Sequence, residues 1–265
     1  MVLNPIPARN WMQTMEKLPL CVSLERWQQA QEWEGAYWRA QHPDRSHVLT
    51  TPLKRLTAKV LNKLGQEADL PSVGDDWNHW WAEQFDQYRA LPSRFNNAIE
   101  LGSGPYTNVR VILEGRSASH LICSDPLVNE YLRFRGQWLA RMWQEGKVYV
   151  DDHPLEECPF ASDYFDLVVV INVLDHCRDS LACIRQAVRI TKPGGFLVIG
   201  QDLSNFDDVQ RIGDDIGHPI RIDHETLDNE LLQVFRKVHY KILSRDEGRN
   251  PSAHYGTYVF IGQKH

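Results

Sequence analysis

The sequence has little that would place the protein in a membrane or in an oxidising compartment. Its longest apolar stretch, 167–173, is interrupted by Asn172 and is far shorter than the ~20 residues that a membrane-spanning helix needs. The first residues, MVLNPIPARN, show no apolar signal-peptide core. The five cysteines form no CxxC pair and are odd in number, and they are Cys21, Cys123, Cys158, Cys177 and Cys183. We therefore expect reduced thiols and a cytoplasmic protein.

Charge of one sign is not in large excess either. Lys and Arg number 29 and Asp and Glu number 35, which gives a net charge of −6 over 265 residues. A mildly acidic chain is a poor electrostatic partner for nucleic acid or an anionic bilayer, so we expect neither as a partner. Hydrophobic residues make up 42% and charged residues 24%, which is typical of soluble globular domains and excludes disordered, collagen-like and coiled-coil chains.

Tryptophan is unevenly distributed along the chain. Seven of the nine tryptophans lie at or before Trp81, and none follows Trp143. Trp77 and Trp81 fall on one face of a predicted helix, and an apolar repeat predicts another helix over 53–64. We therefore predict a helical, Trp-rich N-terminal cap over 1–95, whose aromatic stripe either faces the core or covers a ligand pocket.

From residue 96 onward, short apolar runs alternate with helix-length segments. Strands are predicted over 97–101, 120–124, 147–150, 166–174 and 196–200, and helices over 106–114, 127–145 and 180–190. This alternation predicts an α/β domain over 96–265 with a parallel sheet and helices on both faces. After a last helix at 225–235, the strands 238–243 and 254–262 have no helix between them, so they are predicted to pair antiparallel.

A glycine loop, Glu100-Leu101-Gly102-Ser103-Gly104, follows the first predicted strand and opens the next helix. Glycines there let the backbone turn sharply and approach a ligand. Thr107 occupies the position of the third glycine of the dinucleotide fingerprint, so the pattern GxGxxG is not met. The carboxylate just before the glycines suits a cationic group, such as an amino acid ammonium, better than a pyrophosphate.

Asp125 ends the second predicted strand and has two interpretations. A carboxylate about 20 residues after a glycine loop can accept hydrogen bonds from both hydroxyls of a ribose. The same residue, standing before Pro126, is also a good N-cap for the helix that follows. The occurrence of loop and acid together favours the ribose.

Together these residues resemble the class I S-adenosylmethionine-dependent methyltransferases, in particular the type 11-like members. The resemblance covers about 97–263 and rests on Glu100–Gly104, Asp125, Pro154–Phe160 followed by Phe165–Val168, Leu174–His176 and Lys192–Gly195. It implies a Rossmann-like, doubly wound, seven-stranded sheet with an antiparallel last strand. It also implies S-adenosyl-L-methionine as the cofactor.

The resemblance implies roles for individual residues. The residues expected to bind the cofactor are Glu100, Gly102, Ser103, Gly104, Asp125, Leu155, Glu156 and Asn172. In the family the loop holds the aminoacyl part, the acid after the second strand holds the ribose, and the segment after the third strand borders the adenine. Many relatives carry an Asp where this chain has Pro154, so backbone groups near Leu155 would have to serve the adenine instead.

Polar loops of the C-terminal part are candidates for the acceptor pocket. The residues expected to contact the acceptor are His218, Arg221, His224, Arg249, His254 and Tyr255. His176 and His218 are the candidate general bases, because an imidazole titrates near neutral pH; a wall or helix-capping role is the alternative for His176. The spacing of these histidines matches no standard ligand pattern, so no metal is predicted.

The sequence thus predicts a methyltransferase (EC 2.1.1.-) that moves a methyl group to an oxygen or nitrogen of a small polar acceptor. The segments DIGHPIRID, at 215–223, and EGRNP with HYGTY, at 247–258, are similar to methyltransferases of surface polysaccharide synthesis, which implies a sugar or another metabolite. No NPPY-type tetrapeptide follows the fourth strand, which disfavours methylation of base amino groups.

Three alternatives remain open at this point. The first is an NAD(P)-dependent oxidoreductase, against which Glu100 and Thr107 count. The second is a non-catalytic scaffold that binds S-adenosylmethionine. The third is a protein methyltransferase, which would need an exposed groove rather than an enclosed pocket.

Overall fold

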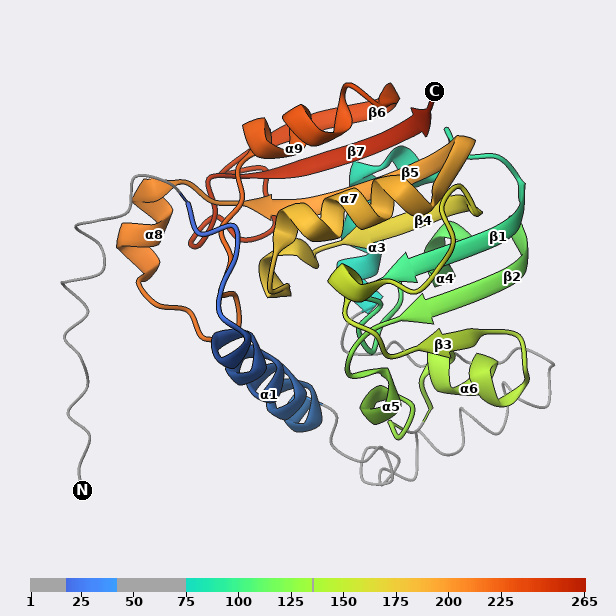
Figure 1. Cartoon of the computed structure of the whole chain (residues 1–265), viewed down its shortest axis with the longest axis horizontal. Coiled ribbons are helices and arrows are strands. Elements are labelled where there is room, and N and C mark those ends of the chain that lie inside the picture. Colours follow the sequence, from blue (N-terminus) through green and yellow to red (C-terminus); the bar gives the residue numbers. More distant parts are fainter. Residues whose placement is uncertain (1–17, 42–74, 135) are drawn as a thin grey trace, which may run out of the picture.

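The computed structural model describes residues 18–41, 75–134 and 136–265 (Figure 1). The helices are α1 (Leu24–Gln41), α3 (Asp75–Gln84), α4 (Val109–Ile112), α5 (Val128–Tyr131), α6 (Trp138–Gln144), α7 (Ser180–Ile190), α8 (Phe206–Ile212) and α9 (His224–Leu231), with single turns η3 (Asp86–Tyr88), η4 (Leu155–Glu157) and η5 (Leu174–His176). The strands are β1 (Arg94–Leu101), β2 (Ser117–Ser124), β3 (Tyr149–Asp151), β4 (Phe165–Ile171), β5 (Thr191–Leu203), β6 (Phe235–Ser244) and β7 (Gly256–Lys264). The helix predicted over 53–64 lies outside the described residues.

The seven strands form one sheet in the order β3-β2-β1-β4-β5-β7-β6. Strands β1 to β5 pair in parallel, and β7 runs antiparallel between β5 and β6. All seven residues of β4 are buried, because helices cover both faces of the central sheet. The predicted doubly wound α/β fold with an antiparallel last strand is confirmed.

Two hydrophobic clusters lie on the two faces of the sheet. One joins Ile184 of α7 and Leu227 of α9 to strand residues such as Val168. The other joins Trp81 of α3 to Val169, which points to the opposite face as the alternation along a strand requires. Figure 1 shows α7 and α9 on the near face.

Three predictions differ from the structure by more than the ends of an element. The helix predicted over 106–114 is only α4. Glu100 accepts hydrogen bonds from the backbone N–H groups of Asn108 and Val109, where this short helix starts. The helix predicted over 127–145 is two helices, and Gly136, with a φ of +78°, lies in the break. The predicted turn at 192–195 is instead part of β5.

The two described helices of the Trp-rich part, α1 and α3, pack in different places. Trp81 is 1% exposed and packs so closely on β5 that a Cβ atom at Gly200 would lie 2.6 Å from its ring. Helix α3 therefore belongs to the helical layer of the sheet, and β1 already begins at Arg94. Only α1, among the described part of 1–95, lies apart from the sheet faces and beside the carboxyl ends of the parallel strands (Figure 1).

Backbone hydrogen bonds fix the segment that leads into α1. Val22 N–H donates to Arg178 O at 2.8 Å, and Ser180 N–H donates to Leu20 O at 3.0 Å. Arg221 N–H donates to Pro19 O at 3.0 Å. These bonds place α1 over the edge of the sheet where ligands of open α/β sheets bind.

Candidate active site

A cavity of about 310 Å³ opens at the carboxyl edge of the parallel strands. Its wall includes α1 and α3, the glycine loop after β1, the ends of β2, β4 and β5, and the loop 249–254. Small-molecule sites of doubly wound sheets lie at this edge, where the strand order reverses beside β1 and β4. The cavity is therefore the candidate active site.

Glu100 lies beneath the glycine loop and does not reach the described cavity wall. Its carboxylate is fully buried and accepts hydrogen bonds from the backbone of Asn108 at 2.9 Å and of Val109 at 3.0 Å. The side-chain amide of Asn108 donates a third bond at 3.1 Å. Burial raises the pKa of Glu100 to about 7, although these hydrogen bonds oppose the shift. Glu100 thus ties the glycine loop to the start of α4.

The glycine loop presents its backbone to the cavity. Gly102 has a φ of +65°, and an added Cβ atom would lie 2.4 Å from a methyl carbon of Val173. Gly104 has a φ of +55° with open space where its side chain would be. Both positions require glycine for the backbone conformation, and Gly102 requires it also for packing.

Asp125 does not N-cap α5, whose N-cap residue is Leu127, but its carboxylate makes two backbone hydrogen bonds. One carboxylate oxygen accepts the N–H of Gly104 at 2.9 Å, and the other accepts the N–H of Leu127 at 2.8 Å. The side chain thus braces the glycine loop and caps the turn after β2, while it also lines the cavity. Burial raises the pKa of Asp125 to about 7, and the charge of Glu34 adds to the shift.

The raised pKa of Asp125 predicts that ionised Asp125 lowers the stability of the unliganded protein as pH rises. Because the folded-state pKa lies above the unfolded value of 3.8, the carboxyl contributes its full stability only below that pH, and the contribution is lost as pH rises through about 7. We expect Asp125→Asn to gain stability over the wild type between pH 5 and pH 8 by about 1–3 kcal/mol. Thermal melts at the two pH values measure the difference. Exposed Asp152→Asn is the control, and an equal gain there would contradict the assignment.

Three further residues expected to hold the cofactor line the cavity: Leu155, Glu156 and Asn172. Glu156 accepts the backbone N–H groups of Arg178 at 2.6 Å and Asp179 at 2.9 Å, so it links η4 to the start of α7. Asn172 has a φ of +57°, and its buried side-chain oxygen has no hydrogen-bond partner among the described residues. That oxygen is available to a donor group of a ligand.

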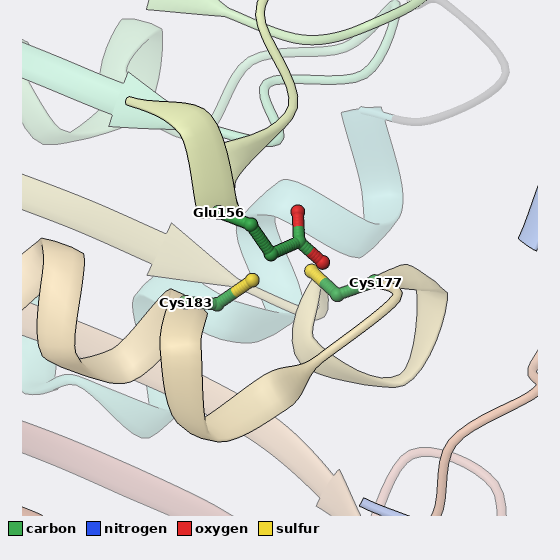
Figure 2. A group of neighbouring side chains, drawn as sticks. All are labelled: Glu156, Cys177 and Cys183. Atoms are coloured by element: carbon green, nitrogen blue, oxygen red, sulfur yellow. The ribbon is translucent and has the colours of Figure 1, made fainter. Parts of the chain in front are cut away.

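Beside η4, Glu156, Cys177 and Cys183 point toward one another (Figure 2). The thiol of Cys177 donates to the carbonyl of Val173 at 3.4 Å. Burial raises the pKa of Cys183, and the pKa of Cys177 is also raised: its contact with Cys183 lowers it, but burial and nearby acids outweigh that effect. Both groups are therefore neutral thiols in the unliganded protein, and Cys177 also lines the cavity.

The acceptor side of the cavity contains two neighbouring histidines. His176 of η5 and His218 have ring centroids 4.5 Å apart. Nδ1 of His218 lies 2.9 Å from the carboxylate of Asp215, and Nδ1 of His176 lies 3.5 Å from that of Glu34. Burial lowers the pKa of His218, but the hydrogen bond to Asp215 and nearby acids outweigh it, so its pKa lies above the usual value.

Arg249 and His254 also line the acceptor side. Arg249 donates to Asp202 at 2.9 Å, and its guanidinium lies 4.5 Å from the ring centre of Trp77. Nδ1 of His254 lies 3.1 Å from the hydroxyl of Ser204, and burial lowers the pKa of this histidine. These contacts hold both side chains in place beside the cavity.

Three residues expected to contact the acceptor lie elsewhere: the described cavity wall does not include Arg221, His224 or Tyr255. Arg221 is buried and donates to the carbonyl of His218 at 2.7 Å, so it supports that loop. The hydroxyl of Tyr255 bonds to the backbone N–H of His224 at 3.0 Å and lies 2.9 Å from its Nδ1. This pair fixes the start of α9 instead.

Sequence reasoning did not assign Glu34, Trp33, Asp175, Asp202 or Asp215, all of which line the cavity. The D-x-x-H spacing of the pair 215 and 218 was a signal for an acid that orients a histidine. Glu34 and Trp33 carried no such signal, because the docking of α1 over the sheet edge depends on tertiary contacts.

The sheet order, the antiparallel β7 and the glycine loop after β1 define the fold of the class I S-adenosylmethionine-dependent methyltransferases. Residues 100–199 match the family model described as a methyltransferase domain, which confirms the resemblance found in the sequence. The family implies S-adenosylmethionine as the cofactor. A comparison with curated protein sequences gives no match.

Solved structures share this fold at low sequence identity. The N-methyltransferase NodS from Bradyrhizobium japonicum WM9, in complex with S-adenosyl-L-homocysteine, has a TM-score of 0.54 at 16% identity, with 90% of this chain and 98% of that chain covered. The YcgJ protein from Bacillus subtilis has a TM-score of 0.53 at 11% identity, covering 70% and 98%. The [4+2]-cyclase SpnF has a TM-score of 0.51 at 15% identity, covering 72% and 80%.

The cavity fits this cofactor. Its wall combines a backbone cradle at Gly104, a carboxylate at Asp125 for hydroxyl groups and the unpartnered oxygen of Asn172 for a donor such as an ammonium.

Among the helices of residues 18–41, 75–134 and 136–265, none combines the length and the apolar character needed to cross a bilayer.

Proposed function

We propose that the protein transfers the methyl group of S-adenosylmethionine to an oxygen or nitrogen of a small polar acceptor, such as a sugar or another metabolite. One observation carries the proposal: a single cavity joins the glycine loop and Asp125 to His176, His218 and Arg249. Residues suited to the cofactor thus lie within reach of residues suited to a polar acceptor.

Bound S-adenosylmethionine supplies a methyl group that its sulfonium already activates. The chain then has to hold the two reactants in line and exclude water, which are effects of proximity and of an enclosed site. Gly102, Gly104 and Asp125 hold the cofactor, and His176 or His218 accepts the proton of an acceptor hydroxyl or amine. In this arrangement Glu100 acts through the glycine loop that it supports.

The walls favour a small acceptor over a protein segment. Trp33, Tyr37 and Trp77 contribute aromatic surface to the cavity, while Arg249 and Asp202 contribute charged groups. Aromatic and charged groups together suit a compact polar molecule with apolar faces, such as a sugar. Helix α1 lies over this space, which opposes the entry of a folded protein surface.

The test begins with cofactor binding by calorimetry on the full chain. We expect S-adenosylmethionine and S-adenosylhomocysteine to bind and NADH not to bind; tight NADH binding without S-adenosylmethionine binding would favour an oxidoreductase. Formation of S-adenosylhomocysteine over a library of sugars, hydroxy acids and amines then identifies the acceptor. Cofactor binding without turnover on any acceptor would favour the scaffold.

The catalytic assignment has a separate readout in the same assay. His176→Ala and His218→Ala are expected to lower kcat by 10²- to 10⁴-fold, an order of magnitude typical of a lost general base, with S-adenosylhomocysteine affinity unchanged. His120→Ala, on an exposed part of β2, is the matched control. Unchanged kcat in both variants would contradict a role for either histidine in the reaction.

A further inference from the structure

The acceptor side of the cavity contains a group of three possible metal ligands. Asp175, His176 and His218 each offer one donor atom, and these atoms lie within 4.8 Å of one another. Nε2 of His176 is 4.0 Å from a carboxylate oxygen of Asp175. The first two residues come from η5 and the third from the loop before α9, so no fixed sequence spacing reveals them.

The outer contacts of this group orient its ligand atoms. Nδ1 of His218 faces Asp215 at 2.9 Å, which leaves Nε2 of that ring for another partner. Metal-binding histidines typically direct their second ring nitrogen to a carboxylate in this way. The buried Nδ1 of His176 lies 3.5 Å from the Glu34 carboxylate and has no hydrogen-bond partner among the described residues. The oriented His218 and this unpartnered nitrogen are second observations that point to a bound cation.

Hydrogen bonds also fix the position of the Asp175 carboxylate, the third possible ligand. A carboxylate oxygen of Asp175 accepts the side-chain N–H of Gln201 at 3.0 Å, and Gln201 in turn accepts the backbone N–H of Leu174 at 3.0 Å. Gln201 and Asp175 are both buried. This chain of bonds ties the position of the carboxylate to β5.

The donor set indicates the class of metal. Two imidazoles and one carboxylate suit divalent first-row transition metals, whereas Mg²⁺ and Ca²⁺ prefer oxygen ligands. Ligands of such an ion lie about 2.0–2.2 Å from it, so the three side chains need to close by only about 1 Å from their present spacing. A set of three protein ligands leaves coordination positions open, and all three residues line the cavity.

We propose that Asp175, His176 and His218 bind one divalent transition-metal ion, and that this ion holds an acceptor with two adjacent oxygen atoms. The acceptor class, a vicinal diol or an α-hydroxy acid, rests on the proposed methyl transfer; the metal site does not. With the ion bound, both imidazoles are ligands and neither acts as the general base; the ion lowers the pKa of the bound hydroxyl, which releases its proton to water. An oxygen–carbon bond forms, the sulfonium carbon–sulfur bond breaks, and the products are the methyl ether, S-adenosylhomocysteine and one proton.

The experiment uses the full chain without a histidine tag, stripped with EDTA and titrated with Co²⁺ and Zn²⁺. We expect one Co²⁺ per chain, seen as visible absorption typical of nitrogen and oxygen ligands, and displaced by Zn²⁺. His176→Ala and His218→Ala should each weaken Co²⁺ binding at least 100-fold. Asp215→Ala, which removes the contact to Nδ1 of His218 and the hydrogen bond from the Gly217 N–H but no proposed ligand, should weaken it about 10- to 100-fold.

His120→Ala is the matched control and should bind Co²⁺ as the wild type does. Equal Co²⁺ binding by His176→Ala, His218→Ala and the wild type would overturn the proposal, as would the absence of binding to the wild type. S-adenosylhomocysteine calorimetry on each variant shows that the cavity is still folded. If that calorimetry fails for the wild type while Co²⁺ binds, the methyl transfer is wrong and the metal site stands; the reverse result removes the metal site alone.

Discussion

Asp125→Ala is expected to weaken S-adenosylhomocysteine binding by roughly 2–4 kcal/mol, or about 30- to 1000-fold. The carboxylate lines the cavity and offers two oxygens to two ribose hydroxyls, and each charge-assisted hydrogen bond contributes about 1.5–3 kcal/mol. Part of the loss comes through Gly104, because the same carboxylate accepts its N–H at 2.9 Å. Calorimetry at pH 8, where the carboxyl is ionised, measures the effect.

Asp152→Ala provides the control for this experiment, because its carboxylate is exposed at the end of β3 and bonds to the side chain of Asn129. Its affinity should match that of the wild type. A thermal melt of Asp125→Ala without ligand separates lost binding from lost folding. Unchanged affinity in a folded Asp125→Ala protein would refute the ribose role.

Gly102→Ala is expected to destabilise the unliganded protein by about 2–4 kcal/mol and to weaken S-adenosylhomocysteine binding at least 10-fold. Two costs add. A side chain at a φ of +65° costs about 1–2 kcal/mol. The new Cβ atom would also lie 2.4 Å from Val173, so the loop or the end of β4 must shift. Chemical denaturation and calorimetry measure the two effects.

Two variants separate these costs. Gly104→Ala has a similar positive φ but no heavy atom within 4 Å of the new Cβ, so its stability loss should stay near 1–2 kcal/mol. A Val173→Ala background removes the contacts of 2.4 Å and 2.5 Å with the two methyl carbons and keeps the 3.0 Å contact with Cβ, so Gly102→Ala should cost less there than in the wild type and more than Gly104→Ala. Equal costs of Gly102→Ala in both backgrounds would show that packing against Val173 is not the cause.

The sequence predicted most reliably what local patterns determine. The continuous apolar run of β4 is a strong local signal for a buried strand. The helix predicted over 180–190 matches α7, whose N-cap Asp179 accepts the N–H of Ala182. The glycine loop and Asp125 were also found, because the ligand-side turn of this fold needs particular residue types at a fixed spacing.

The remainder depends on contacts between distant segments. Residues 192–195 are included in β5 because Thr191 and Phe196, on either side of them, both pair with β4. The break near Gly136 instead follows a local signal, a glycine with a positive φ. The position of Glu100 beneath the loop depends on the side chain of Asn108, eight residues away. For the acceptor side, a single sequence shows which polar residues exist, but not that His218 lies beside His176 while His224 turns toward Tyr255.

The residues that line the cavity come partly from inside the family match and partly from outside it. The family match, 100–199, contains the glycine loop and Asp125, whereas α1, His218 and Arg249 lie outside it. A homologue with a different α1 and different loops around 218 and 249 could therefore bind the same methyl donor and accept a different molecule. Under the proposed function, His176 lies inside the matched stretch and the other proposed acceptor residues lie outside it, so the match by itself does not identify the acceptor.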